Sequence, residues 1–132
     1  MKDLLCDGFQ DCVRHYLIRH KSIVDIMSKL QESSSRVNRA VAKAVTNCGC
    51  IQVHAGRQRI PPGVETLEGL RDHMSTHVEG ELCNHCREVL EEEIGRTLFY
   101  LAALCNTLDL NLYDVLLKEQ ERLSCLGMFN FS

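Results

Sequence analysis

The chain has no tryptophan, and tyrosine and phenylalanine together make up only 5% of its 132 residues. This scarcity excludes a core built on large aromatic rings. Hydrophobic residues still account for 45% of the sequence, so leucine, valine, isoleucine and alanine must form the core. We expect such a core to be packed mainly by helices, in a chain long enough for one domain.

The chain also lacks an excess of positive charge, with a net charge of −3 and a pI near 6.0. No basic field is therefore available to attract nucleic acid or acidic lipid. No stretch approaches the ~18 apolar residues of a membrane span, and residues 1–8 contain no apolar segment typical of an export signal. Eight cysteines without a secretion signal predict reduced thiols and a soluble, cytoplasmic protein.

Four of these cysteines form two short pairs, Cys48-Gly49-Cys50 and Cys83-Asn84-His85-Cys86. Each pair can present two thiolates to one ion, and together they supply the four sulfurs of a closed tetrahedral site. We interpret Cys48, Cys50, Cys83 and Cys86 as metal ligands, with zinc as the favoured ion and an iron–sulfur cluster as the second choice. A disulfide or redox pair, or unrelated buried thiols, are the alternatives.

Helical periodicity organises the rest of the chain into an all-α architecture of four or five helices. Predicted helices cover residues 9–20, 23–48, a short segment after Thr66, 86–108 and a last segment after Asn111. Ser22, Thr66 and Asn111 are the expected helix caps. Residues expected to point inward include Cys12, Tyr16, Val24, Met27, Val41, Val115, Leu116 and Leu123. The nearly all-apolar run from Leu98 to Cys105 marks a buried central element.

Residues 51–66 contain Pro61-Pro62-Gly63 and a short alternating stretch, which indicate an irregular connection with a small hairpin. We therefore predict one helical domain over residues 1–126, an insert at 48–86 that carries the cysteine pairs, and a tail at 127–132. Phe129 and Phe131 in that tail could dock on a neighbouring chain. If the second and central helices pack antiparallel, both cysteine pairs meet at one end, and a bound ion clamps the base of the insert.

The remaining cysteines and histidines have simpler interpretations. Cys12 and Cys105 are expected to be small core residues. Cys6 and Cys125 are expected to lie near the ends of the chain without a functional role. His54, His77 and His85 lie near enough in sequence to compete as ligands, but a surface or supporting role is favoured for each. No Ser/His/Asp order and no glycine-rich phosphate loop indicates hydrolytic machinery.

Two segments carry a resemblance to a known family. The run Lys29-Leu30-Gln31-Glu32-Ser33-Ser34-Ser35-Arg36-Val37 resembles the Lys-Leu-x-Glu-Glu-x-Gly-Glu-Val run of the MazG-like nucleotide pyrophosphohydrolases. Glu92-Glu93-Ile94-Gly95-Arg96 is similar to the family's Glu-Glu-x-Gly-Asp segment, and residues 108–112 resemble the turn before its last helix. The resemblance covers roughly residues 9–46 and 86–123, and it implies a MazG-like helical bundle that forms a homodimer or a higher homo-oligomer.

Family members hold magnesium through a Glu-x-x-Glu pair on one helix and a Glu-x-x-Asp pair on the next. The resemblance places these four positions at Ser33, Arg36, Glu93 and Arg96, of which only Glu93 keeps a carboxylate. Glu32 and Glu92 survive beside them. Arginines at two ligand positions would repel magnesium, so the resemblance implies a site that has lost most of its magnesium ligands. Arg36 and Arg96 are expected either to form a buried ion-pair network with Glu93 or to bind an anion such as a nucleotide phosphate.

The sequence thus predicts a degenerate, catalytically inactive MazG-like domain, with a structural metal site and a role as a binding or interaction module. The first alternative is an active magnesium-dependent nucleoside triphosphate pyrophosphohydrolase, with Glu32, Glu92 and Glu93 joined by Glu88 or Glu91. The second alternative is an iron–sulfur or redox sensor, which depends on the cysteines alone.

Overall fold

A computed structural model of the chain describes residues 4–126. In chain order the elements are α1 (Leu4–Tyr16), α2 (Ile23–Lys43), the π-helical turn η1 (Ala44–Cys48), β1 (Ile51–Val53), α3 (Leu67–His73), β2 (Val78–Gly80), α4 (Asn84–Thr107) and α5 (Leu112–Leu126). The predicted all-α class is confirmed, because the strands form only one two-stranded antiparallel sheet. None of the helices in this part of the chain has the length and apolar character that a membrane crossing needs.

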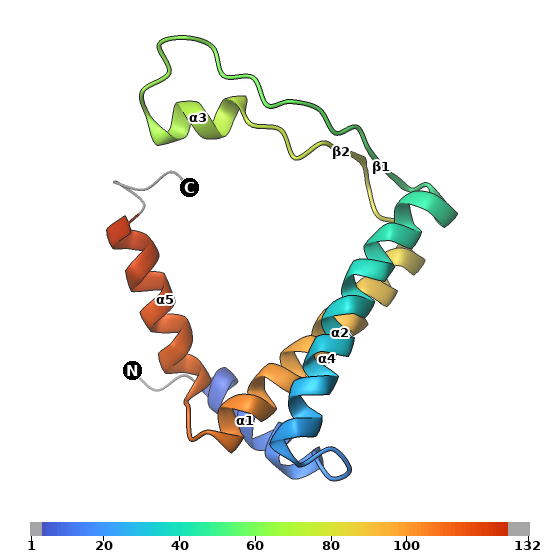
Figure 1. Cartoon of the computed structure of the whole chain (residues 1–132), viewed down its shortest axis with the longest axis vertical. Helices are drawn as coiled ribbons and strands as arrows, with labels where there is room; N and C mark the ends of the chain where they lie inside the picture. The colour runs from blue at the N-terminus through green and yellow to red at the C-terminus, as the bar shows by residue number, and fades with distance from the viewer. Residues whose placement is uncertain (1–3, 127–132) are drawn as a thin grey trace.

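The two longest helices, α2 and α4, lie side by side and antiparallel, and we call this pair the hairpin (Figure 1). Ser22 starts α2 by accepting a hydrogen bond from the backbone N–H of Val24 at 3.3 Å, as an N-cap serine does. The helix ends through η1 and Gly49, whose φ of 77° is the left-handed conformation that favours glycine. The predicted antiparallel arrangement therefore brings the end of α2 to the start of α4.

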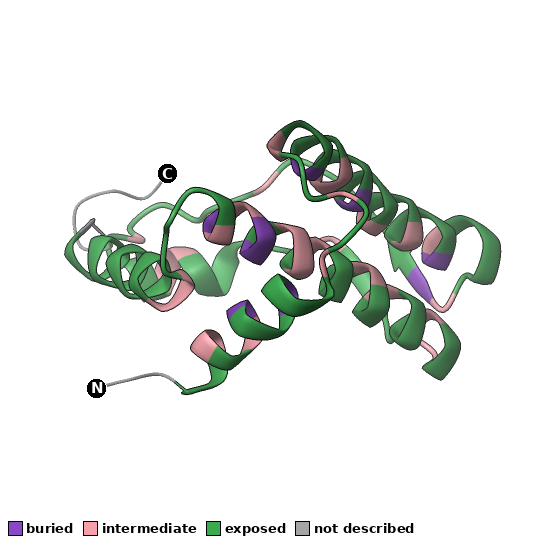
Figure 2. Cartoon of the chain, turned by 90° about the horizontal axis from the view of Figure 1, so that it is seen from below, coloured by how far each residue is buried: buried purple, intermediate pink, exposed green. Residues whose placement is uncertain are grey.

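The core is small and lies where α1 crosses the base of the hairpin. Its fully buried members are Val13, Ile26, Ala102 and Ala103, with Phe9, Leu17, Phe99, Leu104 and Leu112 packed around them. Most of the remaining ribbon is exposed (Figure 2). The described chain therefore has a well-packed base and two long extensions with little core.

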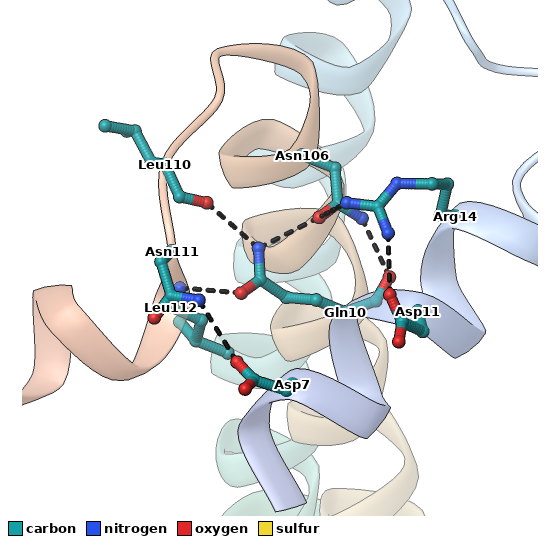
Figure 3. Close-up of polar contacts among 8 residues, drawn as sticks. All are labelled: Asp7, Gln10, Asp11, Arg14, Asn106, Leu110, Asn111 and Leu112. Atoms are coloured by element: carbon teal, nitrogen blue, oxygen red, sulfur yellow. Dashed lines mark hydrogen bonds and ion pairs between the residues drawn. The ribbon is translucent and has the colours of Figure 1, made fainter. Parts of the chain in front are cut away.

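A polar network fastens α5 to this base, and Gln10 is its centre (Figure 3). The Gln10 side chain donates to Oδ1 of Asn106 at 2.9 Å and to the carbonyl of Leu110 at 3.0 Å, and it accepts from the N–H of Leu112 at 2.7 Å. Gln10 is only 5% exposed, so its polar atoms need these partners. The network therefore fixes both the turn before α5 and the first residue of that helix.

Residues 49–83 form the second extension, which we call the arm. It leaves the far end of the hairpin and contains β1, α3 and β2 (Figure 1). The predicted strand at Ile51–Val53 is present, but the proposed small hairpin within 51–66 is wrong, because β1 pairs with Val78–Gly80. The pairing partner lies at the other end of the arm, where residue spacing alone does not point to it.

Several residues expected to point inward do not do so in the single chain. Cys12 is exposed. Tyr16, Val24, Met27, Val41, Val115, Leu116 and Leu123 are 39–71% exposed. Within the predicted buried run, Ala102, Ala103 and Cys105 are buried, whereas Leu98 and Leu101 are 48% and 39% exposed. Helical periodicity identified the apolar faces correctly, but no element within residues 4–126 covers them. The prediction for the tail at 127–132, with Phe129 and Phe131, lies outside the described residues.

Candidate metal centre

The four predicted ligands come together at the junction of the hairpin and the arm. Cys48 ends η1 and Cys50 follows Gly49, while Cys83 caps α4 and Cys86 lies in its first turn. Their four sulfur atoms all lie within 4.8 Å of one another. No other group of three or more His, Cys, Asp or Glu side chains in residues 4–126 is close enough to hold one ion.

The spacing of the sulfurs fits a single tetrahedral ion. A zinc ion bound at about 2.3 Å to each of four thiolates requires sulfur–sulfur edges of about 3.8 Å. The Sγ atoms of Cys48 and Cys83 are 3.7 Å apart. This separation is far too long for a disulfide bond, and none of the eight cysteines, all of which lie within the described residues, is in a disulfide.

The local backbone favours thiolate formation at one of the four positions. The backbone N–H of Cys86 points to Sγ of Cys83 at 3.4 Å. This hydrogen bond lowers the pKa of Cys83 to about 7. The hydrogen bond between the side chains of Cys83 and Cys86 raises the pKa of Cys86 to about 12. The hydrogen bond between the side chains of Cys83 and Cys48 likewise raises the pKa of Cys48. Additional thiolates are unfavourable in so small a volume unless a cation neutralises them, which is the electrostatic situation that a bound metal ion relieves.

The strand that follows Cys50 needs a glycine opposite it. Gly80 has a φ of 88°, and a Cβ atom at this position would lie 2.6 Å from the backbone oxygen of Cys50. Only glycine fits this close approach without a backbone shift. Cys50 itself points back to the carbonyl of Ala44, with its sulfur 3.8 Å from that oxygen. The base of the arm is thus shaped by contacts that hold Cys50 near the end of α2.

The three histidines do not join the ligand group. His54 lies in the arm beside Glu79, with 3.5 Å between Nε2 and the carboxylate oxygen. His77 adopts a positive φ of 61° just before β2. His85 lines a pocket of about 250 Å³ beside Cys48 and Cys86, so it is the histidine placed to influence access to the sulfurs.

The positions taken from the family resemblance lie on the hairpin, away from the cysteines. Ser33 is buried, and its hydroxyl donates to the carbonyl of Leu30 at 2.9 Å. Arg36 pairs with Glu32 at 3.2 Å and Arg96 pairs with Glu93 at 2.8 Å, so each arginine uses a partner on its own helix. The arginine side chains are 54% and 47% exposed. The two pairs are therefore separate and their arginines are half-exposed, so the expected buried network of Arg36 and Arg96 with Glu93 is not formed.

The glutamates of the alternative acidic set are not gathered into one site. Glu92, Glu88 and Glu91 are exposed on α4. Between residues 4 and 126 no three carboxylates lie close enough together to hold one metal ion. Lys29 and, after it, Arg36 lower the pKa of Glu32. In the described chain, Oε2 of Glu93 is the buried side-chain oxygen that has no hydrogen-bond partner.

Cationic side chains surround these positions. One pocket of about 280 Å³ is lined by Lys29, Glu32, Ser33, Arg36, Arg96 and Tyr100. An adjoining pocket of about 360 Å³ is lined by Arg36, Arg39, Ala40, Lys43, Val89 and Glu93. Together they form a groove with five cationic side chains and two carboxylates, on a chain whose net charge is −3. We call it the cationic groove.

Sequence reasoning missed one polar constellation, the network around Gln10. A pocket of about 360 Å³ lies beside it, lined by Asp7, Gln10, Asp11, Arg14, Asn106, Asp109, Leu110 and Asn111. Five of these side chains already join separate segments: Gln10 and Arg14 both bond to Asn106, and Asn111 donates to Asp7 at 3.1 Å. The signal that could have revealed the network is the spacing of Gln10, which shares a helix face with Val13 and Leu17.

Comparison of the chain with protein families, with curated proteins and with solved structures finds no match. The fold and the arrangement of the cysteines therefore carry the functional argument.

Proposed function

We propose that this chain is a catalytically inactive MazG-like helical domain whose four-cysteine metal site holds the base of the arm, and that it works as a self-associating interaction module. The convergence of four sulfurs within 4.8 Å carries the metal part of the proposal. Four cysteine ligands fill a tetrahedral coordination sphere and leave no open position for a substrate or water, which is typical of structural sites.

The sulfur geometry favours one ion over an iron–sulfur cluster. A cluster places several iron atoms between its thiolates, so it needs at least some of the sulfurs farther apart than a single ion does. All four sulfurs here lie within 4.8 Å of one another, only about 1 Å beyond the edge of one tetrahedral site. Zinc is the ion whose ordinary coordination fits this set best.

Metal analysis of anaerobically purified protein tests this part. We expect about one zinc per chain, lost in a Cys83→Ser/Cys86→Ser variant and retained in a matched Cys12→Ser/Cys125→Ser control. Iron together with acid-labile sulfide would favour the sensor alternative. A metal-free wild-type protein that stays metal-free after zinc is added would refute the site.

The lost acidic set supports inactivity. At the positions that the resemblance assigns to magnesium, Ser33, Arg36 and Arg96 leave Glu93 as the one carboxylate, and Arg96 already pairs with it at 2.8 Å. Hard divalent ions require several oxygen ligands. Magnesium-dependent release of pyrophosphate from a nucleoside triphosphate, abolished by Glu93→Gln, would instead establish the active enzyme and overturn this part.

The exposed surface supports self-association as a homodimer. The chain has an accessible surface of 10352 Å² at 15.0 kDa, whereas a compact monomer of this mass exposes about 7,000 Å². The excess of about 3,000 Å² exceeds the ~800 Å² that each partner buries in a standard interface. Sedimentation should show a dimer at micromolar concentration, and a monomer at every accessible concentration would refute this part.

A phosphate-bearing ligand in the cationic groove is the second candidate function. The two carboxylates there are each paired within their own helix, while Arg39 and Lys43 widen the positive surface along α2. Guanidinium groups suit phosphate oxygens because they donate parallel hydrogen bonds. The groove would therefore bind a phosphate chain directly, without magnesium.

Calorimetric titration with inorganic pyrophosphate and with ATP, both without magnesium, tests this candidate. We expect binding that weakens with salt and falls at least tenfold in an Arg36→Gln/Arg96→Gln variant, but stays unchanged in an Arg122→Gln control. Tighter binding of ATP than of pyrophosphate would point to a nucleotide. Absence of binding to the wild-type protein would exclude the candidate.

A further inference from the structure

The arm has too little core to hold its own shape. Within residues 49–83 the one buried residue is Ile51, at the base, and α3 has no buried residue. Large apolar side chains along the arm are 41–49% exposed: Val53, Ile60, Leu67, Met74 and Val78. A segment that exposes this much apolar surface normally has a partner.

The arm and α5 leave opposite ends of the hairpin and extend toward the same side (Figure 1). Helix α5 is fastened at its first residue by the Gln10 network. Beyond that attachment it carries Val115, Leu116 and Leu123, which are 44%, 53% and 56% exposed. The chain therefore extends two apolar-bearing elements beyond its small core, both on one side of the hairpin.

The hairpin itself has an apolar surface that could meet such elements. Ile94, Leu98 and Leu101 recur at helical spacing on α4 and are 39–48% exposed. Met27 and Leu30 of α2 line the same shallow pocket as Leu101, with a volume of about 570 Å³. A second copy of the chain would bring both kinds of surface at once, the apolar hairpin face and the two extensions, which nothing else within residues 4–126 covers.

We propose that the arm and α5 of one chain pack against a second copy of the same chain, and we call this interface the grip. We propose further that the metal ion at the base of the arm controls the affinity of this interface. The inference rests on the self-association proposed above and adds the surface and its control. In a two-fold pair the arm and α5 of each chain contact the hairpin of the other chain, so one interface covers the exposed apolar residues of both copies. The excess surface of about 3,000 Å² per chain is enough for such an interface, because obligate dimers bury ~2,000–5,000 Å² in total.

The ion can control the grip because it joins the two ends of the arm. Cys48 directly precedes the arm and Cys50 lies at its start. Cys83 is its last residue, and Cys86 follows it in α4. Besides these sulfurs, the two limbs of the arm are joined by a sheet of three residue pairs, Ile51–Gly80, Gln52–Glu79 and Val53–Val78. Farther along the arm, they are joined by hydrogen bonds between His54 and His77 and between Gln58 and Ser75. Without the ion the arm must be ordered when the second copy binds, and that ordering weakens association.

The test uses the full-length chain and sedimentation velocity over a wide concentration range, with zinc-loaded protein, with protein stripped by a chelator, and after zinc is restored. We expect metal removal to raise the dimer dissociation constant by about 5–150-fold, the usual range for coupled sites, and zinc to reverse the change. Because coupling is reciprocal and a dimer holds two ions, zinc should bind the dimer more tightly than the monomer by the square root of that factor for each ion.

Variants locate the grip. Leu67→Asp/Met74→Asp in the arm and Leu116→Asp/Leu123→Asp in α5 should each weaken the zinc-loaded dimer at least tenfold. Ile18→Asp is the matched control, since Ile18 is 76% exposed but lies outside both extensions. Helix content by circular dichroism and zinc content verify that each variant is folded and loaded.

The outcomes are distinguishable. A zinc-loaded wild-type chain that stays monomeric overturns both self-association and the grip. A dimer whose affinity is unchanged by metal removal and by the arm substitutions overturns the grip and leaves self-association standing. A dimer weakened by both, with Ile18→Asp unaffected, supports the proposal.

Discussion

One buried amide side chain, that of Gln10, makes three hydrogen bonds where α5 joins the rest of the molecule, so Gln10→Met is a sharp test of the fold. The bond from Asn111 to Asp7, which also joins α1 to the start of α5, is left intact by this change. Methionine keeps the length and nearly the volume of glutamine, so the change removes hydrogen bonds without opening a large cavity. Three bonds are lost, those to Asn106 Oδ1, to the carbonyl of Leu110 and from the N–H of Leu112. Two other contacts of Asn106 survive, its bond to the backbone oxygen of Gln10 and the bond that it accepts from Arg14.

The expected loss of stability follows from those three bonds. Each is worth about 0.5–1.5 kcal/mol net, and a donor left buried without a partner costs more than a bond replaced by water. Because Gln10 is 5% exposed, water replaces its bonds poorly. We expect the free energy of unfolding to fall by about 2–4 kcal/mol, a large share of the ~5–15 kcal/mol typical of a domain.

Urea denaturation followed by circular dichroism measures this change, at one fixed protein concentration because association also contributes to stability. Amide exchange by NMR adds a local readout, since the N–H of Leu112 should lose protection while amides in the middle of α4 keep theirs. Gln120→Met on the exposed surface of α5 is the matched control. A Gln10→Met variant that loses no more stability than the control would refute the role assigned to the network.

Three further changes probe the core, the thiols and the base of the arm. Ile26→Ala, at a fully buried position, should lower the free energy of unfolding by about 2–5 kcal/mol in the same urea titration. Burial raises the pKa of Cys105, so its thiolate fraction at pH 8 is reduced, and mass spectrometry should find alkylation slower there than at exposed Cys12. Equal alkylation rates at the two cysteines would contradict the packing of α4. Gly80→Ala, at a φ of 88° with no room for a Cβ, should weaken zinc binding in a competition titration, whereas Gly56→Ala, in open space, should not.

Local signals in the sequence predicted the starts of the capped helices well, whereas α1, which has no cap signal, runs over Leu4–Tyr16 and not over the predicted residues 9–20. The caps expected at Ser22, Thr66 and Asn111 all accept hydrogen bonds from the first turn of the helix that follows. Such caps depend on residues within three or four positions of one another, which is why they can be recognised without knowledge of the fold. The predicted convergence of the cysteines also depended on simple geometry, since two antiparallel helices must bring the end of one beside the start of the other.

The features that sequence reasoning missed depend on contacts between distant segments. The pairing of β1 with β2 joins residues at the two ends of the arm, and nothing in the alternation of Ile51 and Val53 names the partner. Gln10 was overlooked because a glutamine in an amphipathic helix is usually exposed, although its partners at Asn106 and Leu112 are almost 100 residues away. Periodicity reports which side of a helix is apolar, but it does not report whether the cover comes from the same chain.

The choice of ligand atoms bears on what the metal can do. A magnesium ion that activates a phosphate chain needs oxygen ligands and open coordination positions for water and substrate. At the four hairpin positions that the resemblance assigns to such an ion, Glu93 is the one carboxylate, and Arg96 pairs with it at 2.8 Å. At the end of the hairpin four sulfurs converge and leave no open position. This distribution of donors supports the proposal of a structural metal, because soft ligands that surround an ion hold a fold together and do not expose the ion to a substrate.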